Sequence, residues 1–180
     1  MARFPLPFLP AQSYRHGGIR FGATRTMNDG TTRTHAACDL VVPPGTPVFA
    51  IEWGIVIDVP KTPFIDGTKL YSVIIEHSFF IGRYTEISQE VAEGIYPGAT
   101  VSEGQLISTV QRNNKGRGML HFEMYDKSSS GHLSQKKNTT YKNVPPGNYQ
   151  RRSDLMDPTP YLDEWAAWTD WSETSGADWK

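Results

Sequence analysis

Three side chains that could bind a metal ion occur at two places in the sequence. His35 and Asp39 are four residues apart in "RTHAACDL", and His121 lies in the alternating run "MLHFEMY". Two imidazoles and one carboxylate suit Zn²⁺, and three protein ligands with an open fourth position are typical of a catalytic zinc site, whereas four ligands close a structural one. Four residues of a straight strand span about 13 Å. His35 must therefore lie on a loop that bends back if it shares a metal with Asp39.

Simpler interpretations of these residues stay open. A lone histidine on a strand is more often a structural residue than a ligand, and a histidine four residues before an aspartate arises by chance in many proteins. The three residues are therefore a candidate metal site whose support has to come from neighbouring motifs.

A candidate general base lies in "RYTEIS", where Tyr84 and Glu86 are two residues apart and are expected on one face of a strand. A carboxylate beside a zinc-bound water is a competent base. Glu86 could instead be a fourth metal ligand, which would close the site. Tyr84 is a candidate donor to substrate, with core packing as the alternative.

Met119 and Glu123 flank His121 on the same face of the expected strand. Met119 is about 7 Å from His121 along the strand, so we expect it beside the metal ligands and not among them. A thioether is only a weak acceptor and cannot transfer protons. Glu123 either orients His121 by a hydrogen bond or is a solvated strand residue.

Three further residues are candidates for supporting roles. Arg33, two residues before His35, could pair with a substrate carboxylate, with an ordinary surface arginine as the alternative. Asn28 lies on the same approach loop and is a second candidate for substrate binding. His77 follows the apolar run "YSVII".

Short β-like runs separated by glycine and proline must position these residues. The clearest are a hairpin of residues 71–77 and 83–87, a strand that ends near Val110, and the run at 119–125. The polar stretch 127–150 is predicted to be a long surface loop, and a short helix can begin after Pro160. The pattern predicts one mainly β domain with antiparallel sheets that curl or pack face to face, followed by a short C-terminal helix.

Composition excludes several classes of protein. The 180-residue chain has a net charge of −1, so no overall field attracts nucleic acid. Its single cysteine, Cys38, excludes an intramolecular disulfide and a cysteine-rich zinc site. Nothing in the sequence approaches a membrane span, and the proline-broken start "MARFPLPFLP" does not form a secretory leader. We therefore expect neither membrane insertion nor export through the general secretory pathway.

Several of these motifs, taken in order, resemble the M23 family of LytM- and lysostaphin-like zinc metallopeptidases. They are "RTHAACDLVVPPGTPVFA", "VIIEHSFFIGRYTEI", "GATVSEGQLISTV" and "MLHFEM". The family cuts peptides of bacterial peptidoglycan. The resemblance implies an N-terminal extension at residues 1–14, a metallopeptidase domain at 15–163 and a C-terminal helix and tail at 164–180.

Carried over residue by residue, the resemblance assigns His35, Asp39 and His121 to the three zinc ligands. It matches His77 to a family position whose role is structural or lies behind the metal ligands. Met119 replaces the first histidine of the family's histidine–x–histidine motif, and Glu86 replaces the histidine two residues after a tyrosine. These two departures mark a variant branch. They remove one catalytic helper and exchange another for a carboxylate.

Two kinds of function follow from the resemblance. The first is a zinc-dependent endopeptidase that hydrolyses stem or crossbridge peptides of the cell wall, as a secreted antibacterial effector or a phage lytic component. The second is a catalytically degenerate module that binds wall peptides or a protein partner; a structural β domain of a tail or spike is a weaker third. Expected partners are the wall peptides, a secretion machine or phage particle as carrier, and an immunity protein.

Overall fold

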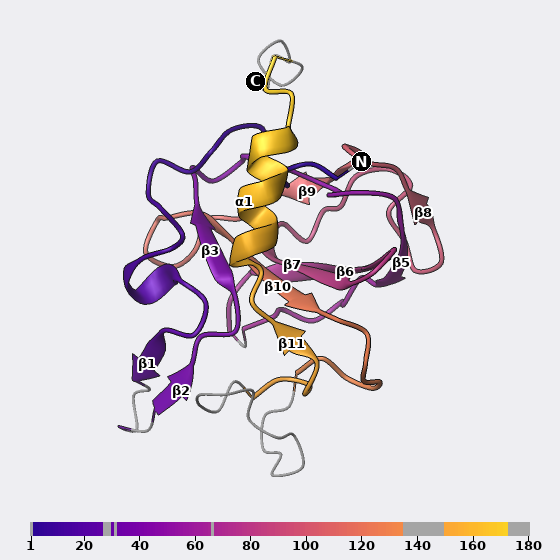
Figure 1. Ribbon diagram of the computed structural model, residues 1–180. Helices are drawn as coiled ribbons and strands as arrows, with labels where there is room; N and C mark the ends of the chain where they lie inside the picture. Colours follow the sequence, from indigo (N-terminus) through magenta and orange to yellow (C-terminus); the bar gives the residue numbers. More distant parts are fainter. Residues whose placement is uncertain (1, 27–29, 31, 66, 135–149, 173–180) are drawn as a thin grey trace.

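Antiparallel strands form most of the regular structure of the chain (Figure 1). The computed structural model describes residues 2–26, 30, 32–65, 67–134 and 150–172. The strands are β1 (Thr24–Thr26), β2 (Thr32–Thr34), β3 (Cys38–Val41), β4 (Pro47–Phe49), β5 (Gly54–Asp58), β6 (Tyr71–His77), β7 (Ile81–Ile87), β8 (Thr100–Val101), β9 (Leu106–Thr109), β10 (Met119–Tyr125) and β11 (Leu155–Met156). A 3₁₀ turn, η1 (Gly17–Ile19), precedes β1, and helix α1 (Thr159–Trp168) follows β11.

Strand β10 lies near one edge of the main sheet and pairs with three other strands. It pairs with β7 on one side and with β3 and β11 on the other, and the sheet continues from β7 through β6 and β5 to β8. In this register His121 is opposite both Asp39 on β3 and Thr85 on β7. Residues directly opposite one another project from the same face of a sheet. The pairing of β3 with β10 therefore brings Asp39 and His121 together.

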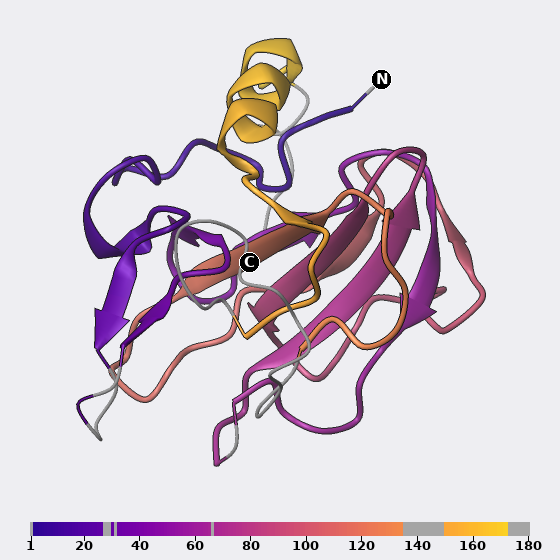
Figure 2. The same ribbon diagram turned by 60° about the horizontal axis from the view of Figure 1, so that its bottom comes forward.

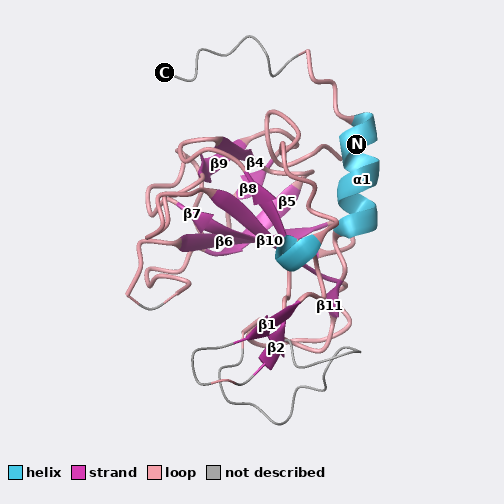
Figure 3. Ribbon diagram, turned by 90° about the vertical axis from the view of Figure 1, so that its left-hand side faces the viewer, coloured by secondary structure: helices cyan, strands magenta, loops and turns pink. Residues whose placement is uncertain are grey.

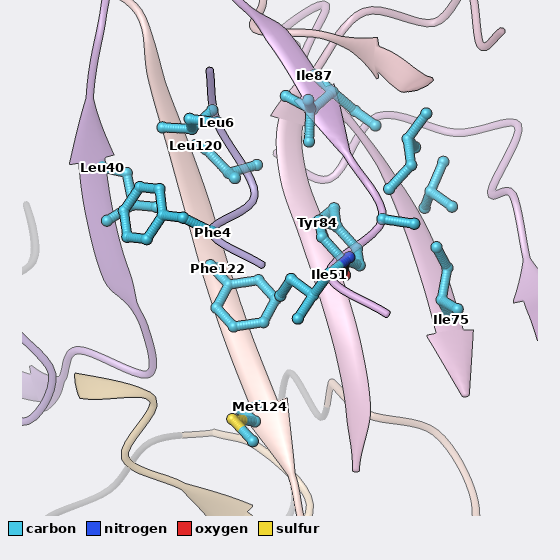
Figure 4. Packing of buried hydrophobic residues seen from close by; sticks show 14 of the residues in the cluster. Phe4, Leu6, Leu40, Ile51, Ile75, Tyr84, Ile87, Leu120, Phe122 and Met124 are labelled. Atoms are coloured by element: carbon cyan, nitrogen blue, oxygen red, sulfur yellow. Dashed lines mark hydrogen bonds between the residues drawn. The ribbon is translucent and has the colours of Figure 1, made fainter. Parts of the chain in front are cut away.

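The other face of β10 supplies the hydrophobic core. Leu120, Phe122 and Met124 alternate with the polar residues of the strand and are fully buried. Figure 4 shows them along β10, with Tyr84 of β7 beside them. The ring centroids of Tyr84 and Phe122 are 5.2 Å apart. The alternation of apolar and polar residues in β10 thus separates the core from the candidate site.

Both ends of the described chain pack against this core. Phe4 and Leu6 are fully buried, and the Phe4 N–H donates a 2.7 Å hydrogen bond to the Thr169 hydroxyl. Figure 2 shows the N-terminal segment passing beside α1, whose Trp165 is also buried. The segment expected as an extension up to residue 14 therefore contributes to the core, and the expected boundary at residue 163 falls inside α1.

The predicted fold class is confirmed: this is a mainly β domain with antiparallel sheets and one short C-terminal helix (Figure 3). Two smaller pairs, β1 with β2 and β4 with β9, accompany the main sheet. Within the residues that the structure describes, no helix has the length and apolar character needed to cross a membrane.

Candidate active site

The side chains of His35, Asp39 and His121 converge on one point. The Nε2 atom of His35 and the Nδ1 atom of His121 lie 3.1 and 2.9 Å from the same Asp39 oxygen, Oδ1. The two nitrogens are 3.4 Å apart, and all three residues are buried. Two separate segments of the chain thus direct three ligand atoms at one position.

A bend between β2 and β3 allows His35 and Asp39 to meet. The His35 N–H donates to the Ala23 carbonyl (2.8 Å), and its carbonyl accepts from the Gly22 N–H (2.9 Å), so His35 continues the pairing of the β1–β2 hairpin. The chain then bends at Ala37 and enters β3. The structure thus has the bend that a shared site requires, because a straight strand would hold the two side chains too far apart.

Each of the three side chains makes a second hydrogen bond, through an atom that points away from the position where the three ligand atoms meet. His35 donates from Nδ1 to the Arg20 carbonyl (2.8 Å), which leaves Nε2 with a lone pair. His121 donates from Nε2 to Oε1 of Glu123 (3.0 Å), which leaves Nδ1 free to coordinate. The second oxygen of Asp39, Oδ2, accepts from Arg25 (2.8 Å). Such partners fix the tautomer and orientation of metal ligands.

The donor set fits zinc. Tetrahedral zinc with bonds of about 2.0–2.2 Å separates its ligand atoms by about 3.3 Å, and the three measured separations lie between 2.9 and 3.4 Å. Burial lowers the pKa of His121, but its hydrogen bonds with Asp39 and Glu123 outweigh this and raise the pKa to about 9. The two carboxylates therefore favour a positive charge at this point, which either a proton or a metal ion can provide.

Glu123 lies on the same face of β10 as His121 and is fully buried. Its Oε1 atom lies 2.8 Å from both Nε and Nη2 of Arg151. Its Oε2 atom accepts a hydrogen bond from the Tyr125 hydroxyl and lies 3.5 Å from Nη1 of Arg83. Burial alone would raise the pKa of Glu123, but Arg151 and Arg83 hold it well below its usual range. Glu123 is thus an ionised, fixed acceptor for the His121 ring.

Glu86 reaches the cleft because β7 contains a bulge. The pairing with β6 passes from Tyr71–Ile87 to Ser72–Thr85, so Glu86 is the extra residue, and its φ of +66° lies in the left-handed region. A bulge interrupts the alternation of side chains, and Glu86 therefore lines the cleft together with His121 and Met119. Burial raises the pKa of its carboxyl, and Asp39 raises it further while His121 opposes.

Tyr84 does not lie where the sequence predicts it. Because of the bulge, Tyr84 and Glu86 do not share a face, and Tyr84 is fully buried in the core. Its hydroxyl is 2.9 Å from Nε2 of His77 and accepts from the Ile51 N–H at 3.2 Å. The Nδ1 atom of His77 is 3.1 Å from the Trp53 carbonyl. Tyr84 is therefore corrected from a substrate contact to a core residue, and His77 braces it without contacting the three candidate ligands.

The ligand triad opens into a cleft of about 660 Å³. Met119 lines it beside His121, as the strand alternation predicts. Phe64, from the segment between β5 and β6, also lines it, 5.4 Å from the His121 ring and 4.5 Å from the Arg83 guanidinium. No sequence signal pointed to Phe64, because it lies on an irregular segment that no periodicity marks.

Arg33 lines the same cleft, on β2, directly opposite Arg25 of β1. Arg83 and Arg151 line it as well and were not predicted. Arg151 is far from His121 in sequence, so no local pattern joins them. Asn28, the other residue expected to contact substrate, lies outside the residues that the structure describes.

The family model of peptidase family M23 matches residues 33–135. The chain belongs to peptidase family M23. The matched segment contains all three candidate zinc ligands as well as Glu86 and Met119. No curated protein matches the chain significantly.

Solved structures of other proteins resemble this M23 chain. A zinc-containing peptidase from Vibrio cholerae is 27% identical over 68% of the chain, with a TM-score of 0.47. The solution structure of lysostaphin is 20% identical over 87% (TM-score 0.53), and Csd3 of Helicobacter pylori is 18% identical over 96% (TM-score 0.51). The chain spans 37%, 54% and 45% of these three proteins, respectively. The likeness to lysostaphin and Csd3 shows that the fold is the LytM- and lysostaphin-like fold of the family.

Proposed function

We propose that this M23 chain is a zinc-dependent endopeptidase that hydrolyses a peptide bond in the stem peptides or crossbridges of bacterial peptidoglycan. The observation that carries the proposal is the convergence of His35, Asp39 and His121. Their three inward atoms have the mutual spacing of zinc ligands, and a separate hydrogen bond holds each side chain. Family membership and the fold shared with lysostaphin, described as an antimicrobial peptidase, support the same conclusion.

His35, Asp39 and His121 would hold the zinc ion. When bound, zinc supplies Lewis acidity toward water and toward the substrate carbonyl. Glu86 then accepts a proton from the attacking water at its carboxylate and returns it to the leaving amine. Met119 takes no part in proton transfer, because a thioether is only a weak acceptor.

Glu86 is proposed as the base and not as a fourth ligand, on three observations. The three-residue cluster, whose ligand atoms lie within 4.8 Å of one another, does not include Glu86. Among the described residues, no hydrogen bond or ion pair engages its carboxylate. Burial raises its pKa, which favours proton acceptance nearer to neutral pH.

A second candidate function rests on the replacement of two family histidines by Glu86 and Met119. If a carboxylate cannot replace the histidine at position 86, the chain is a module that binds wall peptides or a protein partner without cutting them. The expected carrier, whether a secretion machine or a phage particle, and the expected immunity protein stay predictions.

Digestion of purified peptidoglycan sacculi separates the two functions. Zinc-loaded protein is expected to release soluble muropeptides, identified by mass spectrometry. Treatment with a chelator should stop the release, and added zinc should restore it. If wild-type protein with bound zinc sediments with the sacculi and releases nothing, the binding module is the correct function.

A further inference from the structure

Four arginines line the cleft, and three of them are engaged by neighbouring groups. Arg25 donates to Asp39 at 2.8 Å, Arg151 contacts Glu123, and Arg83 donates to the Ser134 hydroxyl. The Arg33 side chain makes no hydrogen bond or ion pair with the residues that the structure describes, although the Arg33 backbone pairs with Arg25 in the β1–β2 hairpin. Within the described part of the chain, Arg33 is therefore the lining arginine whose guanidinium has no protein partner.

The surroundings of Arg33 are unfavourable for a cation on its own. Arg33 is directly opposite Arg25 in the β1–β2 hairpin, and like charges at directly opposed positions destabilise a strand pair. Arg33 is half-buried, and Arg151 lines the same cleft as a further positive charge. A bound anion would compensate both the burial and the repulsion.

The cleft as a whole also favours an anionic ligand. The four arginines face two lining carboxylates, Asp39 and Glu86, and the buried carboxylate of Glu123 beside Arg83 and Arg151, which leaves an excess of one positive charge. Zinc on the ligand triad would add two further positive charges. An arginine donates two parallel hydrogen bonds to a carboxylate. Peptides carry carboxylates, so a carboxylate is the anion that we expect at this site.

The distance along the chain between Arg33 and the ligand triad indicates how far the bound carboxylate would lie from the reacting bond. Arg33 precedes His35 by two residues, which corresponds to about 7 Å of extended chain. Its cross-strand neighbour Arg25 reaches Asp39. Two residues of an extended substrate span a similar length of about 7 Å.

We propose that Arg33 binds a free carboxylate of the peptide ligand, one or two residues from the bond that lies at the ligand triad, with Arg25 beside it. This inference rests on the proposed function and narrows it to peptides that carry such a carboxylate. Two sources are possible in stem peptides: the C-terminal carboxylate, or the free α-carboxylate of a γ-linked glutamate.

Calorimetric titration of the zinc-loaded full chain with two pairs of peptides tests the inference. The first pair is acetyl-L-Lys-D-Ala-D-Ala with a free or an amidated C-terminus. The second is acetyl-L-Ala-γ-D-Glu-L-Lys amide with the glutamate α-carboxylate free or amidated. We expect the acid to bind about tenfold or more tightly than the amide in one pair, because charge-assisted hydrogen bonds are the strong ones; that pair identifies the source.

Variants assign this preference to Arg33. Arg33→Gln should abolish the difference between acid and amide, and Arg33→Lys should keep part of it because a lysine supplies charge without the planar fork. Arg112→Gln, at an exposed arginine that does not line the cleft, is the control and should bind like wild type. Circular dichroism and a thermal melt check each variant, and Arg33→Gln should be at least as stable as wild type because the Arg25–Arg33 repulsion is removed.

Two results would overturn the inference. One is equal binding of acid and amide by wild type in both pairs. The other is a preference that survives in Arg33→Gln, which would place the carboxylate on the metal. If wild type prefers the acid through Arg33 yet releases no muropeptides from sacculi, the carboxylate site stands and the hydrolytic function is wrong.

Discussion

Two regions of the cleft, the ligand triad and the bulge of β7, differ in how firmly their functional side chains are held. On the ligand side, His35, Asp39 and His121 are each fixed by a hydrogen bond to an atom that faces away from the shared point. On β7, the strand paired with β10, the Glu86 carboxylate has no such partner among the described residues, and its backbone is in the left-handed region, which is unfavourable for a glutamate. Unfavourable conformations of this kind concentrate at functional sites.

The difference separates two physical requirements. A metal site needs ligands that are fixed before the ion binds, since preorganisation sets affinity and geometry. A general base needs a carboxylate whose lone pairs are available, because a hydrogen bond from a neighbouring donor would compete with the proton that it must accept. The fold meets the first requirement with three bracing contacts and the second with one bulge.

The largest expected effect comes from removing a ligand. His121→Ala should reduce the metal content from about one zinc ion per chain to none and abolish muropeptide release. Metal analysis of the purified protein measures the first effect. His132→Ala, at an exposed histidine outside the cleft, is the matched control and should keep its zinc. Stoichiometric zinc in His121→Ala would remove His121 from the ligand set.

A smaller effect is expected from loosening the brace on His121. Arg151→Gln takes away the strongest partner of Glu123, so the His121 ring is held less firmly, and zinc affinity should fall about 10- to 100-fold. Competition with a chromophoric chelator measures this affinity, with Arg112→Gln as the control. An unchanged affinity would mean that the Glu123–Arg151 pair serves only the fold.

Outside the cleft, His77 should make stability depend on pH. Burial lowers its pKa from 6.5 to about 4, although its contacts with backbone groups oppose this. Between these values the unfolded chain binds a proton that the folded chain excludes, so lowering the pH from 7.5 to 5 should cost roughly 2 kcal/mol of unfolding free energy. Urea denaturation at both pH values should show a shallower dependence for His77→Gln. Equal dependence in the two proteins would contradict the assignment.

The smallest expected effect is a gain in stability at the bulge. Asparagine tolerates the left-handed region better than glutamate, and Glu86→Asn also removes a buried carboxylate that has no partner in the described part of the chain. The free energy of unfolding should rise by about 0.5–1 kcal/mol while muropeptide release falls. Denaturant titration measures the gain, with the exposed Glu93→Asn as the control. A loss of stability would show that Glu86 supports the fold.

Periodicity in the sequence predicted the elements that carry the site. The run at 119–125 and the strand at 71–77 have the predicted bounds because alternating or continuous apolar residues mark them. The same alternation placed Met119 and Glu123 beside His121. The bend that joins His35 to Asp39 was a condition of the predicted metal site, and the structure contains it.

Other features left no local signal. The bulge at Glu86 contains neither glycine nor asparagine, so an uninterrupted alternation was expected, and Tyr84 was assigned to the wrong face. Arg151 meets Glu123 only through the tertiary fold. Phe4 and Leu6 lie among prolines at the start of the chain, where no periodicity distinguishes a core segment from an extension.

The central claim is a fixed zinc site served by a carboxylate that has no partner among the described residues, and Glu86→Gln tests it most directly. The muropeptide release rate and the zinc content are measured on the same preparation. The account predicts that the rate falls by about 10²- to 10⁴-fold while zinc remains at the wild-type level, because glutamine has the same shape but accepts no proton. A rate equal to that of wild type with zinc bound would show that Glu86 is not the base, and loss of zinc would show that it is a ligand.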